Sequence, residues 1–157
     1  LANRLRKLRT YGMNQKGQAT ENGMNARISE IQAAILRVKL KYLPGWLNRR
    51  RTIARLYHEM VSNPNICMPM TQEDVVPSYH QFVVRCKNRQ KVIDRLSEND
   101  IGWAIHYATP IHKMPAFDKN ESFPVAEKAA AEILSLPVHE ALEDWEVEKV
   151  AKVLNSI

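Results

Sequence analysis

Residues 11–36 read YGMNQKGQATENGMNARISEIQAAIL, a stretch that divides into a loop and a helix. The first half carries three glycines and many polar residues. These predict a loop, because glycine permits positive φ and polar side chains stay solvated or bind a ligand. The second half predicts a helix over about 27–42, because its apolar residues recur at spacings of three and four and fall on one face. These apolar residues are Ile28, Ile31, Ile35 and Val38.

Asn25 and Arg27 lie where the predicted loop becomes the predicted helix. A helix start offers free backbone N–H groups and the positive end of the helix dipole, and Arg27 adds a guanidinium. This combination predicts a phosphate-binding arrangement. A second interpretation stays open on local physics alone, in which Asn25 is only an N-cap and Arg27 only a solvated charge.

The net charge of +6 favours contact with anions, and nucleic acid is the first partner to consider. The basic residues are scattered, however, and no helix-turn-helix, zinc-finger or RNP-like pattern accompanies them. The longest run, Arg49-Arg50-Arg51, falls on the polar part of a predicted helix, where it would be solvated or paired with acidic residues. The sequence therefore disfavours nucleic acid. The phosphates of a cofactor or nucleotide would explain part of the charge.

Composition also bears on location and metal binding. No apolar run approaches the roughly 20 residues of a membrane span, and the basic N-terminal residues do not resemble a secretory signal. We therefore expect no membrane partner and a soluble, cytoplasmic protein. Cys67 and Cys86 lack CxxC spacing and a histidine cluster, so we expect no metal site and thiols in or near the core.

The rest of the chain alternates helical and strand-like segments. Pro44 is expected to start a second helix after the first, and Asn88 to cap a later one. The predicted helices are 1–9, 27–42, 44–62, 89–98, 125–133 and 143–155; the predicted strands are 81–86, 103–107 and 134–139. Residues 64–78 and 108–124 are rich in proline and predict loops. The pattern predicts an α+β fold with about three short strands covered by helices.

Several motifs resemble, in order, those of the DegT/DnrJ/StrS-type sugar aminotransferases. The stretch YGMN to QAAIL resembles that family's glycine-x-asparagine-x-arginine segment and the helix after it. RRRTIARLY (49–57) resembles its arginine-rich helix, and YHQFVVR (79–85) its tyrosine-histidine strand. GWAIHYATPIH (102–112) and FPVAEKAAAEILSLPVH (123–139) resemble its histidine-tyrosine-x-x-proline-x-histidine and leucine-serine-leucine-proline segments. Together the motifs cover nearly the whole chain.

The resemblance implies the small C-terminal domain of a fold type I enzyme that uses pyridoxal 5'-phosphate. Active sites in that family form between two subunits, which implies a homodimer. The resemblance assigns Asn25 to the cofactor phosphate across the dimer, and Arg27 and His112 to the substrate. Tyr107 is a further candidate for substrate contact, although alternation along a strand predicts that either it or His106 is buried.

The implied reaction transfers an amino group from an amino acid, commonly glutamate, to a nucleotide-linked keto sugar. Residues 1–42 would be the end of the large domain with an active-site loop, and residues 43–157 the small domain. The family's Schiff-base lysine motif is absent, and the chain starts at Leu1 in a helical pattern. We therefore expect a piece of a longer enzyme that contains no catalytic lysine and is inactive alone.

Two other classes of function remain open. One is a non-catalytic dimerisation or regulatory domain, and the other is a basic nucleic-acid-binding domain, which the scattered charge disfavours. Within the family, dehydratases and regulatory members differ from aminotransferases at the Schiff-base position. The motifs in this chain do not separate these members.

Overall fold

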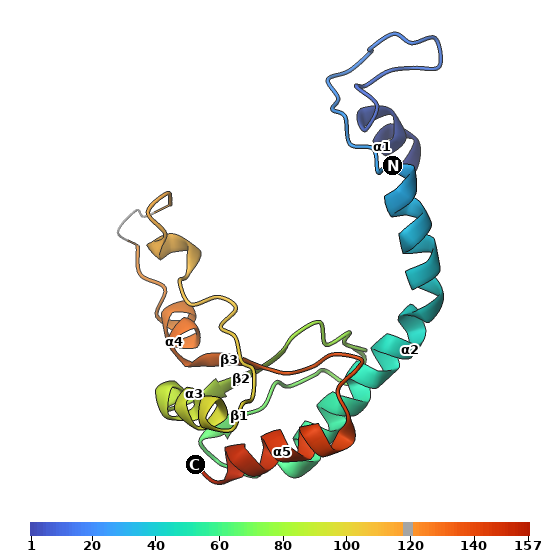
Figure 1. Cartoon of the computed structure of the whole chain (residues 1–157). Helices are drawn as coiled ribbons and strands as arrows, with labels where there is room; N and C mark the ends of the chain where they lie inside the picture. The colour runs from blue at the N-terminus through green and yellow to red at the C-terminus, as the bar shows by residue number, and fades with distance from the viewer. Residues whose placement is uncertain (118–120) are drawn as a thin grey trace. The chain divides into compact units, whose positions relative to one another are not determined.

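The computed structural model describes residues 1–117 and 121–157 (Figure 1). The chain divides into two compact units, Leu1–Leu43 and Pro44–Ile157. Helix α2, Glu30–Met60, contributes its N-terminal part to the first unit and its C-terminal part to the second. The assignment of residues 1–42 to the large domain of a longer enzyme stays a prediction.

The first unit contains helix α1 (Ala2–Leu8), a long ordered loop and the start of α2. Helix α2 starts at Glu30, not near residue 27 as predicted, because Ser29 and Gln32 form reciprocal hydrogen bonds there. The Gln32 backbone N–H donates to Ser29 Oγ (3.3 Å), and the Ser29 backbone N–H donates to Gln32 Oε1 (3.3 Å). This capping box satisfies two backbone donors at the first turn and fixes the start of the helix.

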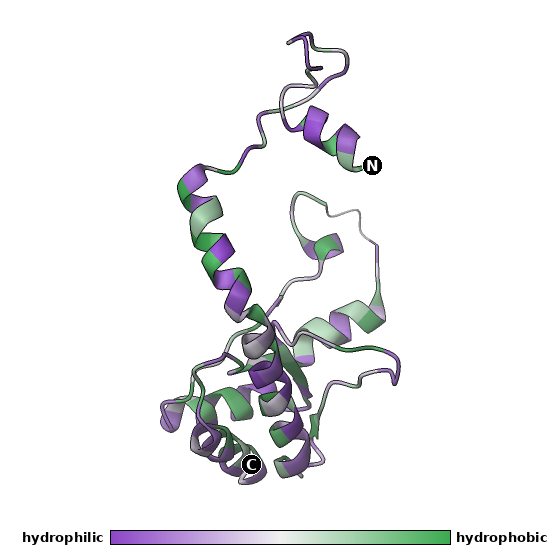
Figure 2. Cartoon of the chain, turned by 90° about the vertical axis from the view of Figure 1, so that its right-hand side faces the viewer, coloured by the Kyte–Doolittle hydropathy of each residue, from purple (hydrophilic) through white to green (hydrophobic). Residues whose placement is uncertain are grey.

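Pro44 lies inside α2, so the two predicted helices, 27–42 and 44–62, are one helix of 31 residues. An interior proline costs about 3 kcal/mol, because it removes a hydrogen bond and crowds the preceding turn. Burial of Ile53, Ala54 and Tyr57 in the second unit stabilises the helix beyond the proline. The apolar residues predicted to share one face of this helix, Ile28, Ile31, Ile35 and Val38, are exposed in this chain. Figure 2 shows hydrophobic residues, in green, interspersed with polar ones along this part of α2.

The second unit contains a three-stranded antiparallel sheet in the order β1-β2-β3, which confirms the α+β prediction. Its strands are Ile66–Cys67 (β1), Phe82–Cys86 (β2) and Ile133–Leu136 (β3). Phe82 is paired with Leu136, and Ile66 with Cys86. The predicted strand 103–107 is wrong, because only Ala104 forms a bridge, with Ser135. The strand that the prediction missed is β1, which lies within residues 64–78, a segment predicted to be a loop.

Four further helical segments complete the second unit. They are α3 (Arg89–Glu98), the 3-10 helix η1 (Ile111–Lys113), α4 (Pro124–Glu132) and α5 (Asp144–Asn155). Asn88 caps α3 as predicted, accepting from the Lys91 backbone N–H at 3.2 Å. No helix among the described residues is both long and apolar enough to cross a lipid bilayer.

The core of the second unit joins α2, the sheet, α3 and α5. Tyr57 and Phe82 are fully buried with ring centroids 5.0 Å apart. Burial raises the pKa of Tyr57, and its protonated hydroxyl donates to the Pro137 carbonyl at 2.9 Å. Cys86 is buried as predicted, and burial raises its pKa to about 11. Cys67 is exposed, contrary to the prediction.

The triple arginine is not merely solvated. All three guanidinium groups donate to backbone carbonyls of other segments, and Arg49 and Arg50 also pair with Asp144 and Glu140. The carbonyl partners are Leu142 for Arg49, Tyr79, His80 and Val138 for Arg50, and Pro77 for Arg51. Because each carbonyl belongs to a loop, the arginines fasten these loops to α2.

Asn155, the last residue of α5, closes the C-terminal end of α2. Its Oδ1 accepts from the backbone N–H groups of Ser62 (2.9 Å) and Asn63 (3.2 Å), and its Nδ2 donates to the Met60 carbonyl (2.8 Å). Asn63 reciprocates with a bond from its Nδ2 to the Leu154 carbonyl (2.8 Å). The side chains of Asn155 and Asn63 therefore join the two helix ends.

Candidate functional site

The loop that carries Asn25 is held mainly by its own backbone. The Met24 N–H donates to the Leu8 carbonyl (2.9 Å), and the Ala26 N–H donates to the Arg9 carbonyl (3.0 Å). Gly23 lies so close to the opposite strand of the loop that a Cβ on it would be 2.1 Å from Gly12 N. Gly12 itself has a φ of +69°, and a Cβ there would be 1.8 Å from the Glu21 carbonyl oxygen. Both positions require glycine, and together they set the path of residues 10–25.

Asn25 and Arg27 lie together on the exposed side of this loop. Arg27 Nε donates to Asn25 Oδ1 at 3.2 Å, which leaves the Asn25 amide NH₂ and the outer guanidinium nitrogens without a protein acceptor among the described residues. The predicted helix-start geometry is wrong, because α2 begins at Glu30. What the structure provides instead is a side-chain amide and a guanidinium joined to each other, both suited to an anion.

Glu21, the acidic residue of the same loop, is neutralised locally. Lys7 Nζ lies 3.1 Å from Glu21 Oε1, and Arg4 Nε lies 3.3 Å from Glu21 Oε2. The hydrogen bond from Lys7 is the main reason why the pKa of Glu21 is lowered, and the charge of Lys7 and the contact with Arg4 add to it. Because this carboxylate is already paired, it does not oppose the binding of an anion at Asn25 and Arg27.

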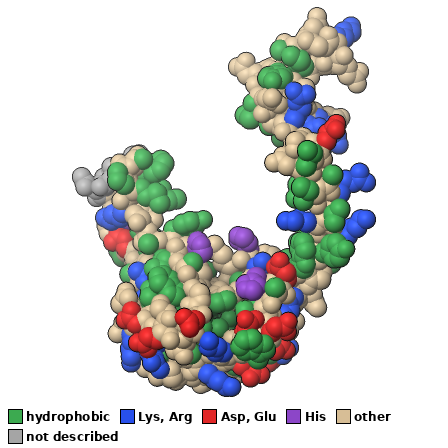
Figure 3. Space-filling model, viewed as in Figure 1, with side chains coloured by type: hydrophobic (Ala, Val, Ile, Leu, Met, Phe, Trp, Pro, Cys, Tyr) green, Lys and Arg blue, Asp and Glu red, His purple; other side chains and the backbone are tan. Residues whose placement is uncertain are grey.

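The second unit contains a cavity of about 510 Å³ beside the edge of β3 that Ala104 bridges. Its walls combine two indoles, Trp103 and Trp145, with three imidazoles and the charged groups of Asp100, Glu146 and Lys149. The imidazoles belong to His80, His106 and His139. Figure 3 shows histidine side chains, in purple, gathered on one face of this unit. The volume is within the range of small-molecule pockets.

Tyr107 and His112, the sequence-predicted residues of this unit, lie on one segment that runs from the cavity to η1. Tyr107 is 73% exposed. His112 is half-buried, and its Nε2 lies 3.0 Å from Glu127 Oε1, so the structure gives it a carboxylate partner within the protein. His106 is half-buried and is hydrogen-bonded to Ser135 Oγ at 3.0 Å, so it is the more buried member of the His106–Tyr107 pair.

Sequence reasoning missed Glu127, Ser135 and the two cavity tryptophans as site residues. Glu127 had a usable signal, since an acid three residues after Pro124 lies in the first turn of a helix. Ser135 is a polar residue between leucines on a strand, which indicates a buried hydroxyl that needs a partner. Asn25 and Arg27 belong to one unit, and Tyr107 and His112 belong to the other. Within the described residues, no group of three or more histidine, cysteine, aspartate or glutamate side chains could hold a metal ion.

Comparison with known proteins identifies relatives across the whole chain. The chain is 41% identical over 157 residues to a dTDP-3-amino-3,6-dideoxy-alpha-D-galactopyranose transaminase of Aneurinibacillus thermoaerophilus, covering 99% of this chain and 43% of the relative. It is 44% identical over 143 residues to the erythromycin biosynthesis sensory transduction protein EryC1 of Saccharopolyspora erythraea, covering 88% and 39%. The chain thus spans less than half the length of these curated relatives.

A solved structure agrees with these relatives. The crystal structure of DesV from S. venezuelae in complex with a ketimine intermediate superposes with a TM-score of 0.92 at 36% identity, covering 99% of this chain and 43% of that chain. The model of the DegT/DnrJ/EryC1/StrS aminotransferase family matches residues 1–155. This chain therefore belongs to the DegT/DnrJ/EryC1/StrS aminotransferase family.

Proposed function

We propose that the intact protein is a pyridoxal 5'-phosphate-dependent aminotransferase that moves an amino group from an amino acid, glutamate, to a nucleotide-linked keto sugar. The observation that carries the proposal is the family match over residues 1–155, with a relative whose name specifies a transaminase of a dTDP-linked sugar. The protein would be a cytoplasmic homodimer with active sites shared between subunits.

The residues of this chain fit one part of the cofactor. A phosphate accepts hydrogen bonds from amides and guanidinium groups, and the exposed Asn25 amide offers two N–H bonds that no described residue occupies. We assign Asn25 to the cofactor phosphate of the partner subunit and Arg27 to the diphosphate of the sugar nucleotide. The hydrogen bond between Arg27 and Asn25 would orient the amide toward its ligand. Pyridoxal phosphate, when bound, would carry the nitrogen between the two halves of the reaction.

Tyr107 and His112 would contact the substrate. The Tyr107 phenol is exposed and can donate a hydrogen bond to a sugar or phosphate oxygen. His112 would contact the substrate through the part of its ring away from Nε2, because Nε2 is already bonded to Glu127.

We place the Schiff-base lysine outside this chain. A Schiff-base lysine reacts as a neutral amine, which desolvation favours. Of the lysines that the structure describes, all except Lys7 are exposed, and Lys7 is paired with Glu21. Borohydride reduction of the intact protein loaded with pyridoxal phosphate, followed by peptide mapping, should place the label outside residues 1–157. Stoichiometric labelling of one lysine within the chain would contradict this placement.

Substitution of Asn25 tests the assignment to the phosphate. Asn25→Ala in the intact enzyme should weaken cofactor binding by about tenfold or more, because one hydrogen bond to a charged phosphate is lost. Equilibrium dialysis against pyridoxal phosphate measures the change in Kd. Gln15→Ala, an exposed residue of the same loop, is the matched control and should leave Kd unchanged. An unchanged Kd in Asn25→Ala counts against Asn25, whereas failure of the unaltered enzyme to bind the cofactor counts against the proposed function.

A non-catalytic, regulatory role is the second candidate, favoured by one observation. The relative from Saccharopolyspora erythraea is named as a sensory transduction protein. A regulatory protein of this kind would form the dimer without exchanging amino groups, so isotope exchange between labelled glutamate and 2-oxoglutarate separates the two candidates. Nucleic-acid binding has no comparable support, because the longest basic run is engaged within the protein.

A further inference from the structure

The segment 106–112 is attached at its first end to strand β3 through Ser135. The Ser135 backbone N–H donates to the Ala104 carbonyl (2.7 Å), and the Ala104 N–H donates to the Ser135 carbonyl (3.3 Å). The Ser135 hydroxyl then makes the 3.0 Å bond to His106 Nδ1. Ser135 is the one buried polar residue among those that the structure describes, at 6% exposure. A buried hydroxyl needs a partner, and here the partner is the histidine that begins the segment.

The second end of the segment is attached to the start of α4 through Glu127. Besides His112, the Glu127 carboxylate accepts from the Phe123 backbone N–H (3.0 Å) and from Ser122 Oγ (3.3 Å). The bond from Phe123 and then the bond from His112 lower the pKa of Glu127, so the carboxylate stays charged at neutral pH. The His112 side chain is 13% exposed, and its ring packs edge-on against Phe123 with centroids 4.8 Å apart.

Tyr107 lies between these two anchors. Its ring packs edge-on against His106, with centroids 5.8 Å apart, and no described residue accepts from its hydroxyl. The two histidines that flank it each commit a ring nitrogen to an internal partner. We propose that Ser135 and Glu127 are positioning residues that hold His106 and His112, and thereby fix segment 106–112 so that Tyr107 is set in place for the nucleotide-sugar substrate. The substrate in this inference rests on the proposed function.

Anchoring has a direct energetic consequence for binding. A free loop must be ordered when its ligand binds, and each ordered side chain costs about 0.5–1.5 kcal/mol of affinity. In a segment that is fixed at both ends, the side chains are already ordered by folding, so binding does not have to order them. The two anchors should therefore act on substrate affinity, and neither needs to touch the substrate.

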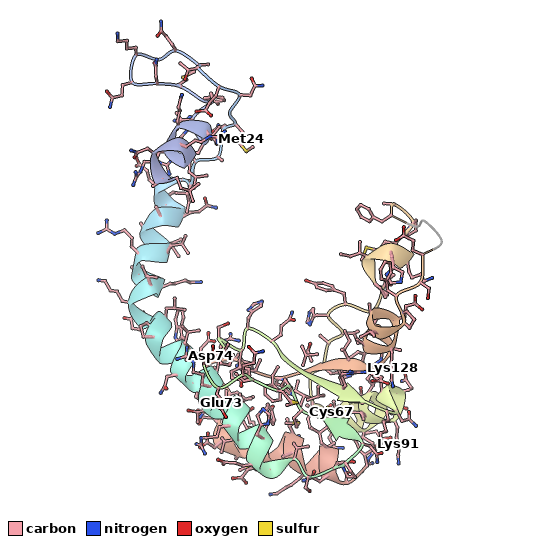
Figure 4. All side chains as sticks on the ribbon, turned by 180° about the vertical axis from the view of Figure 1, so that it is seen from behind. Met24, Cys67, Glu73, Asp74, Lys91 and Lys128 are labelled. Carbon is pink, nitrogen blue, oxygen red and sulfur yellow. The ribbon has the colours of Figure 1, made fainter. Side chains whose placement is uncertain are left out.

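Hydrogen exchange in the intact protein tests the anchors independently of the reaction. The amides of residues 107–114 should exchange about tenfold faster in Glu127→Ala and in Ser135→Ala, since each loses about one hydrogen bond to the segment. Glu127→Gln keeps an acceptor oxygen and should restore most of the protection. Lys128→Ala, the next residue on α4, is the matched control (Figure 4) and should leave exchange unchanged. Unchanged exchange in both Glu127→Ala and Ser135→Ala would overturn the proposal.

Kinetics then test the effect on the substrate. In Glu127→Ala the KM for the nucleotide sugar should rise about tenfold, while the KM for the amino-acid donor and the Kd for pyridoxal phosphate stay unchanged. A parallel rise in all three constants would indicate general loss of structure and overturn the positioning role. If the unaltered protein exchanges no amino group, the proposed function fails and the substrate role of Tyr107 with it, while the exchange data still decide whether Ser135 and Glu127 anchor the segment.

Discussion

The two parts of helix α2 carry similar residues in opposite surroundings. In the first unit Ile35 is 52% exposed, whereas in the second Ile53 is completely buried. Gly12 is the one buried residue of Leu1–Leu43, a range that the structure describes throughout, so hydrogen bonds and glycine contacts define that unit. The second unit is defined by a core that joins α2, α3, α5 and the three strands. Apolar spacing along a helix therefore predicts a face, but the surrounding elements decide whether it is covered.

Substitution of the two isoleucines should give the largest difference in the free energy of unfolding. Ile53→Ala should lower the free energy of unfolding by about 2–5 kcal/mol, because it leaves a cavity in the core. Ile35→Ala, the same change on the same helix, should alter it by no more than about 0.5 kcal/mol. Urea unfolding of this chain followed by circular dichroism measures both. A similar loss in both variants would show that Ile35 is buried in solution.

The arginines of α2 give the next contrast. Arg50→Ala should lower the free energy of unfolding by about 1.5–3 kcal/mol. The carbonyls of Tyr79, His80 and Val138 lose a charged hydrogen-bond donor in this variant. Arg55→Ala should cost only about 0.3–0.5 kcal/mol, because its single partner, Glu59, is an exposed neighbour one turn away. Thermal unfolding of both variants compares them. Equal losses would mean that the carbonyl contacts of Arg50 add nothing to an ordinary surface ion pair.

Two glycines give a contrast in which the expected changes in the free energy of unfolding have opposite signs. Gly23→Ala should destabilise the loop by about 1–3 kcal/mol, because the new Cβ meets backbone atoms, and the Met24 and Ala26 amides should lose protection from exchange. Gly45→Ala should stabilise the chain by about 0.5–1 kcal/mol, because Gly45 is helical and its Cβ would enter open space. Protected Met24 and Ala26 amides in Gly23→Ala would mean that the loop relaxes around the new methyl group.

Several elements could be predicted from the sequence because local rules determine them. The span of α3 follows from the Asn88 cap and three buried residues at helical spacing, and β2 follows from a short β-rich run. The start of α2 could also have been predicted from the sequence, since Ser29 and Gln32 have the spacing of a capping box. Ile28 obscured that signal, because it extends the apolar spacing of the helix past the real start.

The remaining features depend on tertiary contacts that local patterns do not contain. Residues 103–107 have β-forming side chains but make only one bridge, so they are not a strand. The two residues of β1 are too few to give a periodic signal, and they pair because Cys86 and Arg85 lie opposite. The pairings of His112 with Glu127 and His106 with Ser135 join residues 15 and 29 positions apart. Sequence reasoning therefore selected His112 and Tyr107 as candidates but missed Glu127 and Ser135, which are bonded to His112 and His106.

Because Asn155 caps the C-terminal end of α2, the order in which the chain is synthesised affects its folding. Helix α2 and the strands precede α5 in the chain, so they leave the ribosome before Asn155, which caps α2, and before Val150 and Leu154, which complete the core. Until then Tyr57 and Phe82 lack part of their covering, so the nascent chain presents apolar surface to chaperones and to other chains. The second unit should therefore fold only after α5 has left the ribosome, and loss of the last turn of α5 should cause aggregation rather than a small loss of stability.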